Sequence, residues 1–160
     1  MIVEPLRLRV VPEVRDLMAL GEPYVRVRTI SDYWLYAQLF SSTCPVAIIA
    51  GRVAGAVIAF RSQDDPDDVY VQDVMTHPQQ RRQGIARALL GAVRERAEAW
   101  GCGRLYLTSE PENGVAHAAW LSLGFVNVPG DITVGGVSVI TGFKGEGKDR
   151  AVYEREVAGS

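Results

Sequence analysis

Residues 74–86 decide the fold of this chain, and they read Val74-Met75-Thr76-His77-Pro78-Gln79-Gln80-Arg81-Arg82-Gln83-Gly84-Ile85-Ala86. The alternation of Val69–Thr76 predicts a strand, and Pro78 ends it because proline lacks the N–H that sheet pairing needs. Apolar side chains at helical spacing follow Gly84 and predict a long helix that stops near Gly101. The stretch is therefore predicted to be the end of a strand, a polar loop and the start of a helix.

The polar loop before this helix has the properties of an anion site. The first backbone N–H groups of a helix have no partner within the helix, and the helix dipole adds about half a positive charge there. Gly84 has no Cβ, so a phosphate can approach the backbone closely, and Arg81 and Arg82 add mobile positive charge. The pattern favours phosphate binding, although a helix start with a solvated basic face would give the same pattern.

Charge is segregated along the chain around the same loop. Residues 81–104 contain six Arg and two Glu, a net charge of +4, whereas residues 61–77 contain one Arg and five Asp, a net charge of −4. The whole chain has 17 basic and 19 acidic side chains and a formal net charge of −2. A near-neutral chain argues against nucleic acid as a partner, but not against a polyanionic cofactor. The acidic stretch leaves room for a cationic amine beside it.

Length and composition predict one globular domain over residues 1–160. With 160 residues, 48% of them hydrophobic, the chain can bury a core of ordinary size. Its two cysteines, Cys44 and Cys102, are too few and too far apart for a disulfide framework or a metal site. The apolar stretch 46–60 is interrupted at Gly51-Arg52, and the N-terminus does not resemble a signal peptide. We therefore expect no metal, no membrane partner and a cytoplasmic location.

The rest of the chain gives strand and helix signals in a single mixed α/β order, without a repeat or a linker. Pro12 opens a helix that Gly21 closes, and Ser31 or Asp32 can cap a second helix. Two further helices are expected to begin near Gly84 and Asn113. The expected strands are Leu6–Val10, Val46–Ala50, Val53–Phe60, Val69–Thr76, Arg104–Thr108, Val134–Thr141 and Arg150–Val157.

Two motifs in this order resemble the GCN5-related N-acetyltransferase (GNAT) superfamily. Residues 81–86 are similar to its Arg/Gln-x-x-Gly-x-Gly/Ala acetyl-CoA signature, and residues 113–116 with Gly124-Phe125 are similar to its Asn-x-x-Ala…Gly-Phe segment. The resemblance covers residues 1–125 well and the tail loosely. It implies a central mixed, mostly antiparallel sheet, splayed at a bulged strand, with about seven strands and four helices. It also implies an acyltransferase with acetyl-CoA as co-substrate.

The resemblance assigns cofactor roles to the first motif and to the helix of the second. Unpaired backbone groups of Val74, Met75 and Thr76 would bond the pantetheine arm, and the N–H groups of residues 82–86 would hold the pyrophosphate. Asn113 would reach the pantetheine from the later helix. The cofactor-binding residues implied are Val74, Met75, Thr76, Arg81, Arg82, Gln83, Gly84, Ile85, Ala86, Asn113 and Trp120.

The usual catalytic positions of the family hold other residues here. Trp120 stands where many members have a tyrosine acid, and Thr108 stands where a subset has a glutamate. An indole N–H donates a hydrogen bond but does not release its proton usefully, so Trp120 is expected to pack on the cofactor. A base that relays through water need not touch the amine, which leaves His117, Glu110 and Asp73 as catalytic candidates. Each could instead be a surface residue or a structural hydrogen-bond partner.

The expected second helix and the bulged strand offer candidates for an acceptor pocket, although aromatic side chains at helical spacing more often belong to a core. Tyr33 and Tyr36 come from the helix, and Tyr70 and Gln72 come from the strand. Period two would place Tyr70, Gln72 and Val74 on one strand face. Residues within 33–86 also resemble, more weakly, the diaminobutyrate acetyltransferases, which points to an amino-acid-like or polyamine-like acceptor.

Our first hypothesis is an enzyme that acetylates a primary amine of a small molecule by direct attack in a ternary complex. No cysteine lies in the motifs to form an acyl-enzyme. One alternative is a protein or peptide N-acetyltransferase. Another is a CoA-binding module without catalysis, which the replaced tyrosine and glutamate motivate. The habit of the family also favours a homodimer.

Overall fold

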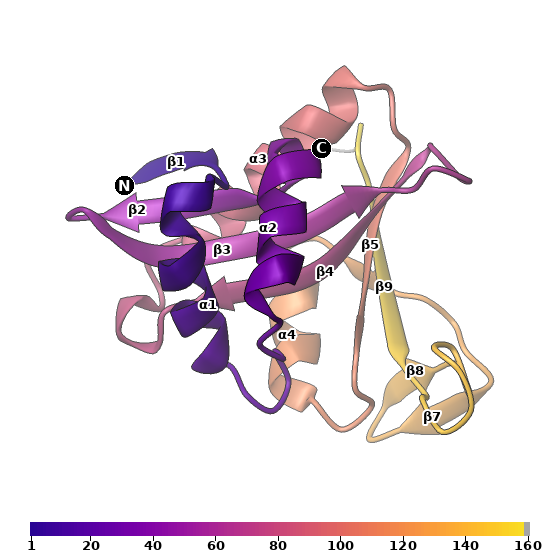
Figure 1. The fold of residues 1–160 in the computed structure, drawn as a ribbon. Coiled ribbons are helices and arrows are strands. Elements are labelled where there is room, and N and C mark those ends of the chain that lie inside the picture. Colours follow the sequence, from indigo (N-terminus) through magenta and orange to yellow (C-terminus); the bar gives the residue numbers. More distant parts are fainter. Residues whose placement is uncertain (159–160) are drawn as a thin grey trace.

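The computed structural model, which describes residues 1–158, has a seven-stranded sheet with helices on both faces (Figure 1). The helices are α1 (Val11–Ala19), α2 (Ile30–Leu39), α3 (Ile85–Ala99) and α4 (Gly114–Ser122). The strands are β1 (Ile2–Pro5), β2 (Pro45–Ile49), β3 (Arg52–Arg61), β4 (Asp68–Thr76), β5 (Arg104–Ser109), β6 (Val126–Asn127), β7 (Ile132–Val134), β8 (Val137–Val139) and β9 (Ala151–Glu156). No helix in residues 1–158 is long and apolar enough to cross a membrane.

The strand order is β1-β2-β3-β4-β5-β9-β6, and β7 pairs with β8 in a separate hairpin. All neighbours are antiparallel except β4 and β5, which pair in parallel only where Asp68–Tyr70 lies beside Arg104–Tyr106. Beyond Tyr70 the two strands separate, as Figure 1 shows. The mixed, mostly antiparallel and splayed sheet predicted from the sequence is confirmed. The splay leaves one edge of β4 without a partner strand.

A β-bulge in β4 lies just beyond the point of separation. In the register with β3, Ile58 opposes Asp73 and the next residue, Ala59, opposes Val71. Gln72 is therefore the extra residue of β4. A bulge changes the side to which the following residues point.

The bulge decides which helices the side chains of β4 meet. Val71 belongs to the core under α3, so its neighbour Tyr70 points to the opposite face of the sheet. After the bulge, Val74 packs against the core under α3, whereas Met75 belongs to the core under α1 and α2. The expectation that Tyr70, Gln72 and Val74 share one face is therefore wrong, because the bulge lies between them.

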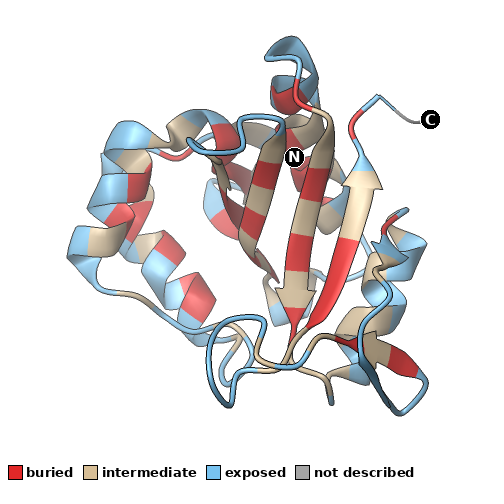
Figure 2. Cartoon of the chain, turned by 90° about the vertical axis from the view of Figure 1, so that its right-hand side faces the viewer, coloured by how far each residue is buried: buried red, intermediate tan, exposed pale blue. Residues whose placement is uncertain are grey.

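Each face of the sheet has its own hydrophobic core. On one face, α3 contributes the buried side chains Leu89 and Val93. On the other face, α1 and α2 contribute Val14, Met18 and Tyr33, all fully buried. Figure 2 shows the alternation of buried and less buried residues along the strands. Burial stabilises the fold by roughly 1.5–3 kcal/mol for each large apolar side chain, so both helical layers are held firmly on the sheet.

The N-terminal strand lies earlier in the chain than the sequence predicts. β1 covers Ile2–Pro5, whereas the expected strand Leu6–Val10 contains a short 3₁₀ helix at Leu8–Val10. The alternation there does not mark a sheet face, because Leu6 is buried but Leu8 is 48% exposed. The 3₁₀ helix leads directly into α1, which begins one residue before the predicted Pro12.

Two other boundaries differ from the prediction. α2 is capped by Thr29, whose Oγ1 accepts the N–H of Asp32 while the Asp32 carboxylate accepts the N–H of Thr29, both at 3.1 Å. The sequence prediction, Ser31 or Asp32, was wrong because Asp32 is the third helical residue of this capping box. The expected strand Val134–Thr141 is shorter in the structure, because Gly135 and Gly136 form the turn between β7 and β8.

Candidate active site

The unpaired edge of β4 borders the gap between β4 and β5. Val74, Met75 and Thr76 lie beyond Tyr70, the last residue of β4 that pairs with β5. Their other edge is paired with β3. Backbone N–H and C=O groups that point away from β3 can bond an extended ligand as an added strand would.

The loop between β4 and α3 ends in a glycine that its backbone conformation requires. Gly84 is the N-cap of α3 and has a φ of 74°, in the left-handed region that favours glycine. An added Cβ would meet no other atom within 4 Å, so conformation explains the glycine, and the open space leaves room for a phosphate. Arg82, two residues earlier, also has a positive φ of 67°.

The first turn of α3 offers hydrogen-bond donors. The N-cap Gly84 has no side chain, and the N–H of Ala88 donates to the Gly84 carbonyl at 3.0 Å. The N–H groups of Ile85 and Ala86 precede this bond and have no acceptor within the helix. With the positive end of the helix dipole and the preceding arginine side chains, these donors make an electropositive loop.

The same loop is anchored at both ends. The N–H of His77 donates to the Ala54 carbonyl of β3 at 2.8 Å. Nearer α3, the Gln83 amide donates to the Gln80 side chain, also at 2.8 Å. These bonds hold the loop in place at the end of β4.

α4 brings Asn113 and Trp120 to the end of β5. Asn113 is the N-cap of α4, and its Oδ1 accepts the N–H of Ala116 at 3.1 Å. Trp120 Nε1 donates to Ser109 Oγ at 2.9 Å. Along Gly114–Ser122 no residue is fully buried, although the helix is apolar. α4 therefore keeps apolar surface that a pantetheine arm could cover.

Two of the predicted catalytic residues are held on this side of the sheet. His117 Nδ1 and the Tyr153 hydroxyl share a hydrogen bond of 2.6 Å. Tyr153 is fully buried on β9, and burial raises its pKa to about 12, so its hydroxyl keeps its proton. Glu110 follows β5, and its carbonyl accepts the N–H of Asn113 at 3.1 Å. His117 thus has a partner on β9, and Glu110 lies in the turn that leads into α4.

The third predicted catalytic residue, Asp73, lies on the opposite face, towards α2. It follows the bulge residue Gln72 and is only 7% exposed. Burial raises the pKa of Asp73 from its ordinary value of 3.8 to about 6, although the positive charges of Arg28 and Lys144 act to lower it. A carboxylate with this pKa is ionised at neutral pH and can take up a proton easily.

Arg28 faces Asp73 but makes no hydrogen bond with its carboxylate. Arg28 Nη2 lies 3.8 Å from Asp73 Oδ2, which is too long for a hydrogen bond. Within residues 1–158, Arg28 Nε and Asp73 Oδ2 are the buried side-chain polar atoms that lack a hydrogen-bond partner. Unpaired buried polar atoms cost roughly 1–3 kcal/mol each, and such atoms need an explanation. A ligand with both an anionic and a cationic group would satisfy the two together.

Tyr33 and Tyr36 of α2 hold this pair in place. The Tyr33 hydroxyl accepts the backbone N–H of Arg28 at 3.1 Å. Tyr33 is fully buried and packs edge-to-face on Tyr36, with ring centroids 5.7 Å apart. Burial raises the pKa of both phenols, so both stay neutral. The two tyrosines therefore belong to the core and also support the segment that carries Arg28.

Tyr70 meets a cation at the point where β4 and β5 separate. Lys144 Nζ donates to the Tyr70 hydroxyl at 2.7 Å and lies 5.4 Å from the centroid of its ring. Tyr70 also packs on Tyr106 of β5, with ring centroids 5.1 Å apart. Lys144 comes from the loop between β8 and β9, far away in the sequence.

Comparison with known proteins identifies the family of this chain. The sequence model of the acetyltransferase (GNAT) family matches residues 13–125. The chain belongs to the GNAT family. The match includes the β4–α3 loop, Asp73 and α4.

Curated relatives of this GNAT protein include L-2,4-diaminobutyric acid acetyltransferases. The one from Nocardia farcinica is 31% identical over 91 residues, which are 57% of this chain and 47% of the relative. The one from Bordetella parapertussis is 29% identical over 102 residues, which are 63% of this chain and 55% of the relative. The chain spans about half the length of these curated relatives.

Solved structures show the same fold at low sequence identity. One is the diaminobutyrate acetyltransferase EctA from Paenibacillus lautus, solved with L-2,4-diaminobutyric acid and coenzyme A. Its TM-score is 0.75 at 21% identity, over 96% of this chain and 92% of that chain. The ribosomal-protein-S18-alanine N-acetyltransferase from Escherichia coli has a TM-score of 0.71 at 17% identity, over 99% and 95% of the two chains. The names of these two structures show that enzymes with this fold acetylate a small molecule in one case and a protein in the other.

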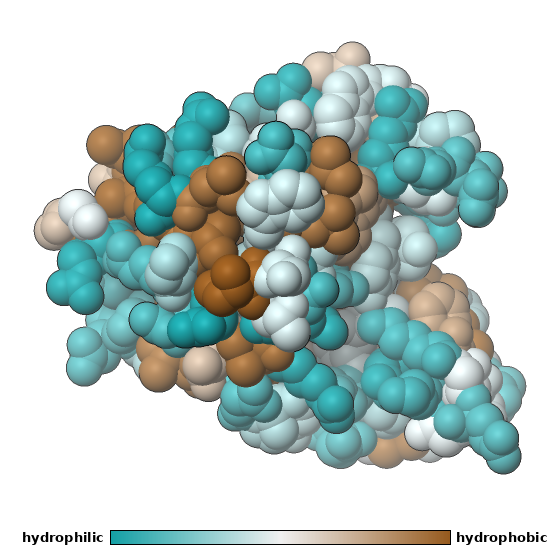
Figure 3. All heavy atoms as spheres, in the orientation of Figure 1, coloured by the Kyte–Doolittle hydropathy of each residue, from teal (hydrophilic) through white to brown (hydrophobic). Residues whose placement is uncertain are grey.

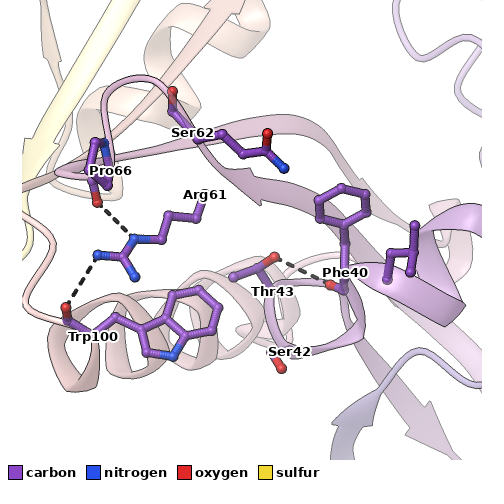
Figure 4. A pocket seen from close by; sticks show the side chains of 9 residues that line it. Phe40, Ser42, Thr43, Arg61, Ser62, Pro66 and Trp100 are labelled. Carbon is purple, nitrogen blue, oxygen red and sulfur yellow. Dashed lines mark hydrogen bonds between the residues drawn. The ribbon is translucent and has the colours of Figure 1, made fainter.

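A separate cavity has a volume of about 470 Å³ (Figure 4). It is bordered by the end of α2, the end of β3 and the end of α3, and none of the predicted site residues lines it. Arg61 crosses it, with Nε donating to the Pro66 carbonyl at 2.8 Å and Nη2 to the Trp100 carbonyl at 3.5 Å. The guanidinium group of Arg61 in this cavity therefore already donates hydrogen bonds to backbone carbonyls.

Sequence reasoning missed Arg28 and Lys144. Arg28 lies in the irregular segment between α1 and α2, and Lys144 lies in the loop between β8 and β9. Neither position follows a periodic pattern, so no spacing rule marks it. The only local signal is that Arg28 is a basic side chain just before the helix predicted to line the acceptor pocket, and this becomes informative only in three dimensions.

Proposed function

We propose that this GNAT protein transfers the acetyl group of acetyl-CoA to a primary amine of a small acceptor that also carries a carboxylate. The pair Arg28–Asp73 carries the proposal, because a half-buried cation and a buried anion each keep a buried polar atom without a hydrogen-bond partner beside the opening of the sheet. The relatives named L-2,4-diaminobutyric acid acetyltransferases support this class, since that amino acid has two ammonium groups and one carboxylate.

The cofactor would lie along the unpaired edge of β4. Backbone groups of Val74, Met75 and Thr76 would bond the pantetheine arm, and Asn113 and Trp120 would border it from α4. The pyrophosphate would lie on the donors of the loop and first turn of α3, which are Arg81, Arg82, Gln83, Gly84, Ile85 and Ala86. The free N–H groups and the left-handed N-cap support this placement.

The acceptor would bind on the other face of the sheet. Arg28 would receive its carboxylate, and Asp73 would receive its ammonium group. Tyr33 and Tyr36 support Arg28 from α2, and Tyr70 lies at the point where β4 and β5 separate. Gln72, the bulge residue between Tyr70 and Asp73, completes the predicted acceptor site.

The acceptor must lose a proton before it can attack. The ionised Asp73 carboxylate takes this proton directly or through one water. The amine nitrogen then bonds to the thioester carbonyl carbon, the C–S bond breaks, and the thiolate takes its proton from the attacking nitrogen or from water. A backbone N–H near Met75 would polarise the carbonyl. Trp120 provides no proton, since an indole does not release its proton usefully and its Nε1–H already donates to Ser109 Oγ.

The experiment compares two amines that differ only in the carboxylate. L-2,4-diaminobutyrate and 1,3-diaminopropane have the same three-carbon diamine, and release of free CoA thiol measures turnover of each. We expect kcat/KM for diaminobutyrate to be at least about tenfold higher, because a charge-assisted hydrogen bond is worth about 1.5–3 kcal/mol. A thermal shift with acetyl-CoA alone, measured in parallel, reports binding of the cofactor.

Other outcomes would favour the alternatives. A thermal shift without thiol release for any amine favours a CoA-binding module without catalysis. Turnover of peptides with free N-termini, but not of either diamine, favours a protein or peptide N-acetyltransferase. Absence of any shift with acetyl-CoA contradicts the cofactor site itself.

A homodimer, a cytoplasmic location and a single catalytic domain over residues 1–160 also belong to this proposal. Apolar side chains gather on the outer surface of α1 and α2 (Figure 3), and this supports association with a second copy. Among them, Ile30 is 43% exposed, Trp34 50% and Leu39 64%. Analytical ultracentrifugation tests the dimer directly.

A further inference from the structure

This chain contains very few lysines, and they lie close together in the sequence. The sequence has fifteen arginines but only two lysines, Lys144 and Lys148. Both lie in the glycine-rich loop between β8 and β9. Apart from the N-terminal amine, the protein therefore offers its proposed chemistry only two primary amines of its own.

This loop is held at its base and presents Lys144 towards the site. Ile140 and Arg150 form a β-bridge, and the N–H of Gly142 donates to the Asp149 carboxylate at 2.8 Å. At the tip, the N–H of Lys144 donates to the Lys148 carbonyl at 3.2 Å. The backbone of the loop is thus fixed by its own hydrogen bonds.

The amine of Lys144 lies at the border of the proposed acceptor site, where β4 and β5 separate. Its Nζ contacts the hydroxyl and the ring of Tyr70, which is the last residue of β4 that pairs with β5. The unpaired edge of β4 begins directly afterwards, and Tyr70 points to the same face as Asp73. The positive charge of Lys144 also acts to lower the pKa of Asp73. The ammonium group of Lys144 therefore contacts Tyr70 on the same face of the sheet as the carboxylate that is proposed to receive the ammonium group of the acceptor.

We propose that Lys144 is a self-acetylation site, at which the protein transfers an acetyl group from bound acetyl-CoA to its own side chain when no small amine is present. This inference rests on the proposed function. Lys148, in the same loop, makes no contact with Tyr70 in the structure described for residues 1–158 and is the built-in control.

The step balances without any further reactant. The ammonium group of Lys144 loses one proton to the Asp73 carboxylate or to water. Its nitrogen bonds to the thioester carbonyl carbon, the C–S bond breaks, and CoA leaves as a thiolate that is protonated from the attacking nitrogen or from water. The products are free CoA and an uncharged acetyl-lysine, which no longer presents a cation to Tyr70.

The test uses purified protein and acetyl-CoA labelled with carbon-13 in the acetyl group, without an added amine. Chymotryptic cleavage after Phe143 gives a peptide with both lysines, so fragment ions compare Lys144 with Lys148 in one molecule. We expect at least about tenfold more label on Lys144, at a rate that does not change when the protein is diluted, since the transfer is intramolecular. An unlabelled acetyl group already present on Lys144 but not on Lys148 supports the inference equally.

Two variants separate enzymatic from spontaneous acetylation. Lys144→Arg should keep the charge and lose the label, and Asp73→Asn should reduce the label on Lys144 to the level of Lys148. Equal labelling of both lysines, or a rate that rises with protein concentration, overturns the inference. So does an unlabelled Lys144 in protein that acetylates diaminobutyrate in a parallel reaction, a result that leaves the proposed function intact. If neither Lys144 nor diaminobutyrate is acetylated, the proposed function fails and the inference fails with it.

Discussion

The proposed cofactor side and the proposed acceptor side of this site are built from different kinds of groups. On the cofactor side, residues 74–86 form one continuous stretch, and backbone N–H and C=O groups do most of the proposed binding. On the acceptor side, the groups are side chains from three separate segments: Arg28 before α2, Asp73 on β4 and Lys144 before β9. Backbone donors survive most substitutions, whereas a site made of side chains changes with each of them. Acceptor choice can therefore diverge while the cofactor site stays the same.

Substitution of Asp73 should give the largest effect and should affect the acceptor side alone. Loss of a general base typically slows a reaction by about 10²–10⁴-fold. We expect Asp73→Asn to lower kcat/KM for diaminobutyrate by at least about 100-fold and to leave the Kd of acetyl-CoA within about twofold. Thiol release and calorimetric titration measure the two quantities.

The control variants for this prediction are His117→Gln, Glu110→Gln and Asp64→Asn. Asp64 is an exposed acid in the loop before β4, so its substitution should change neither quantity. His117 and Glu110 were predicted as catalytic from the sequence, and we expect each variant to lose less than about tenfold. A larger loss for His117→Gln than for Asp73→Asn would move the base to the cofactor side and contradict the comparison.

Asp73 should also make stability depend on pH. Its pKa is raised to about 6 in the folded protein, against an ordinary value of 3.8, so the folded state binds more protons between these values. Stability contributed by this group is therefore highest at acidic pH and falls as the pH rises from about 4 to about 6, by roughly 2–3 kcal/mol in total. Urea unfolding at several pH values should show this loss relative to Asp73→Asn, which cannot ionise. Parallel curves for the two proteins would mean that the carboxyl is not buried as described.

Arg28→Gln should change acceptor choice without changing the cofactor side. If Arg28 receives the carboxylate, the ratio of kcat/KM for diaminobutyrate over 1,3-diaminopropane should fall by about 10- to 100-fold. The Kd of acetyl-CoA should stay unchanged. An equal fall for both diamines would show that Arg28 only supports Asp73 and does not contact the acceptor.

The two sides also differ in how far the sequence predicts them. The β4–α3 loop could be predicted because its signals are local: a strand pattern, a proline, a glycine and a helical repeat. The sequence proposed Asp73 as a catalytic residue and Tyr33 and Tyr36 as acceptor-pocket residues, and the structure brings these three side chains together around Arg28. Arg28 and Lys144 themselves lie in irregular segments, where no periodicity marks a residue.

The face of β4 was the main structural error, and it has a tertiary cause. Period two places Tyr70 and Val74 together, but the extra residue Gln72 separates them onto opposite faces. Nothing in the amino-acid sequence of β4 marks Gln72 as the bulge, because the position of the bulge is set by the register of β4 with β3. The N-terminal strand shows the same limit, since five alternating residues fit both a strand and the 3₁₀ helix that forms at Leu8–Val10.

The smallest expected effect tests the backbone character of the cofactor side with a matched pair of glycines. Gly84 has a φ of 74° before α3, whereas Gly91 lies within α3, and an added Cβ meets no atom within 4 Å at either position. Gly84→Ala should lower the free energy of unfolding by about 1–2 kcal/mol, since a non-glycine residue strains the left-handed region. Gly91→Ala should raise it by about 0.5–1 kcal/mol, since alanine favours a helix interior. Urea unfolding of both variants measures these opposite signs.

The Kd of acetyl-CoA should rise only for Gly84→Ala, because only that substitution disturbs the N–H groups of the first turn. The ratio between the two diamines should change in neither variant, and a change in Gly84→Ala would show that the cofactor loop also shapes the acceptor site.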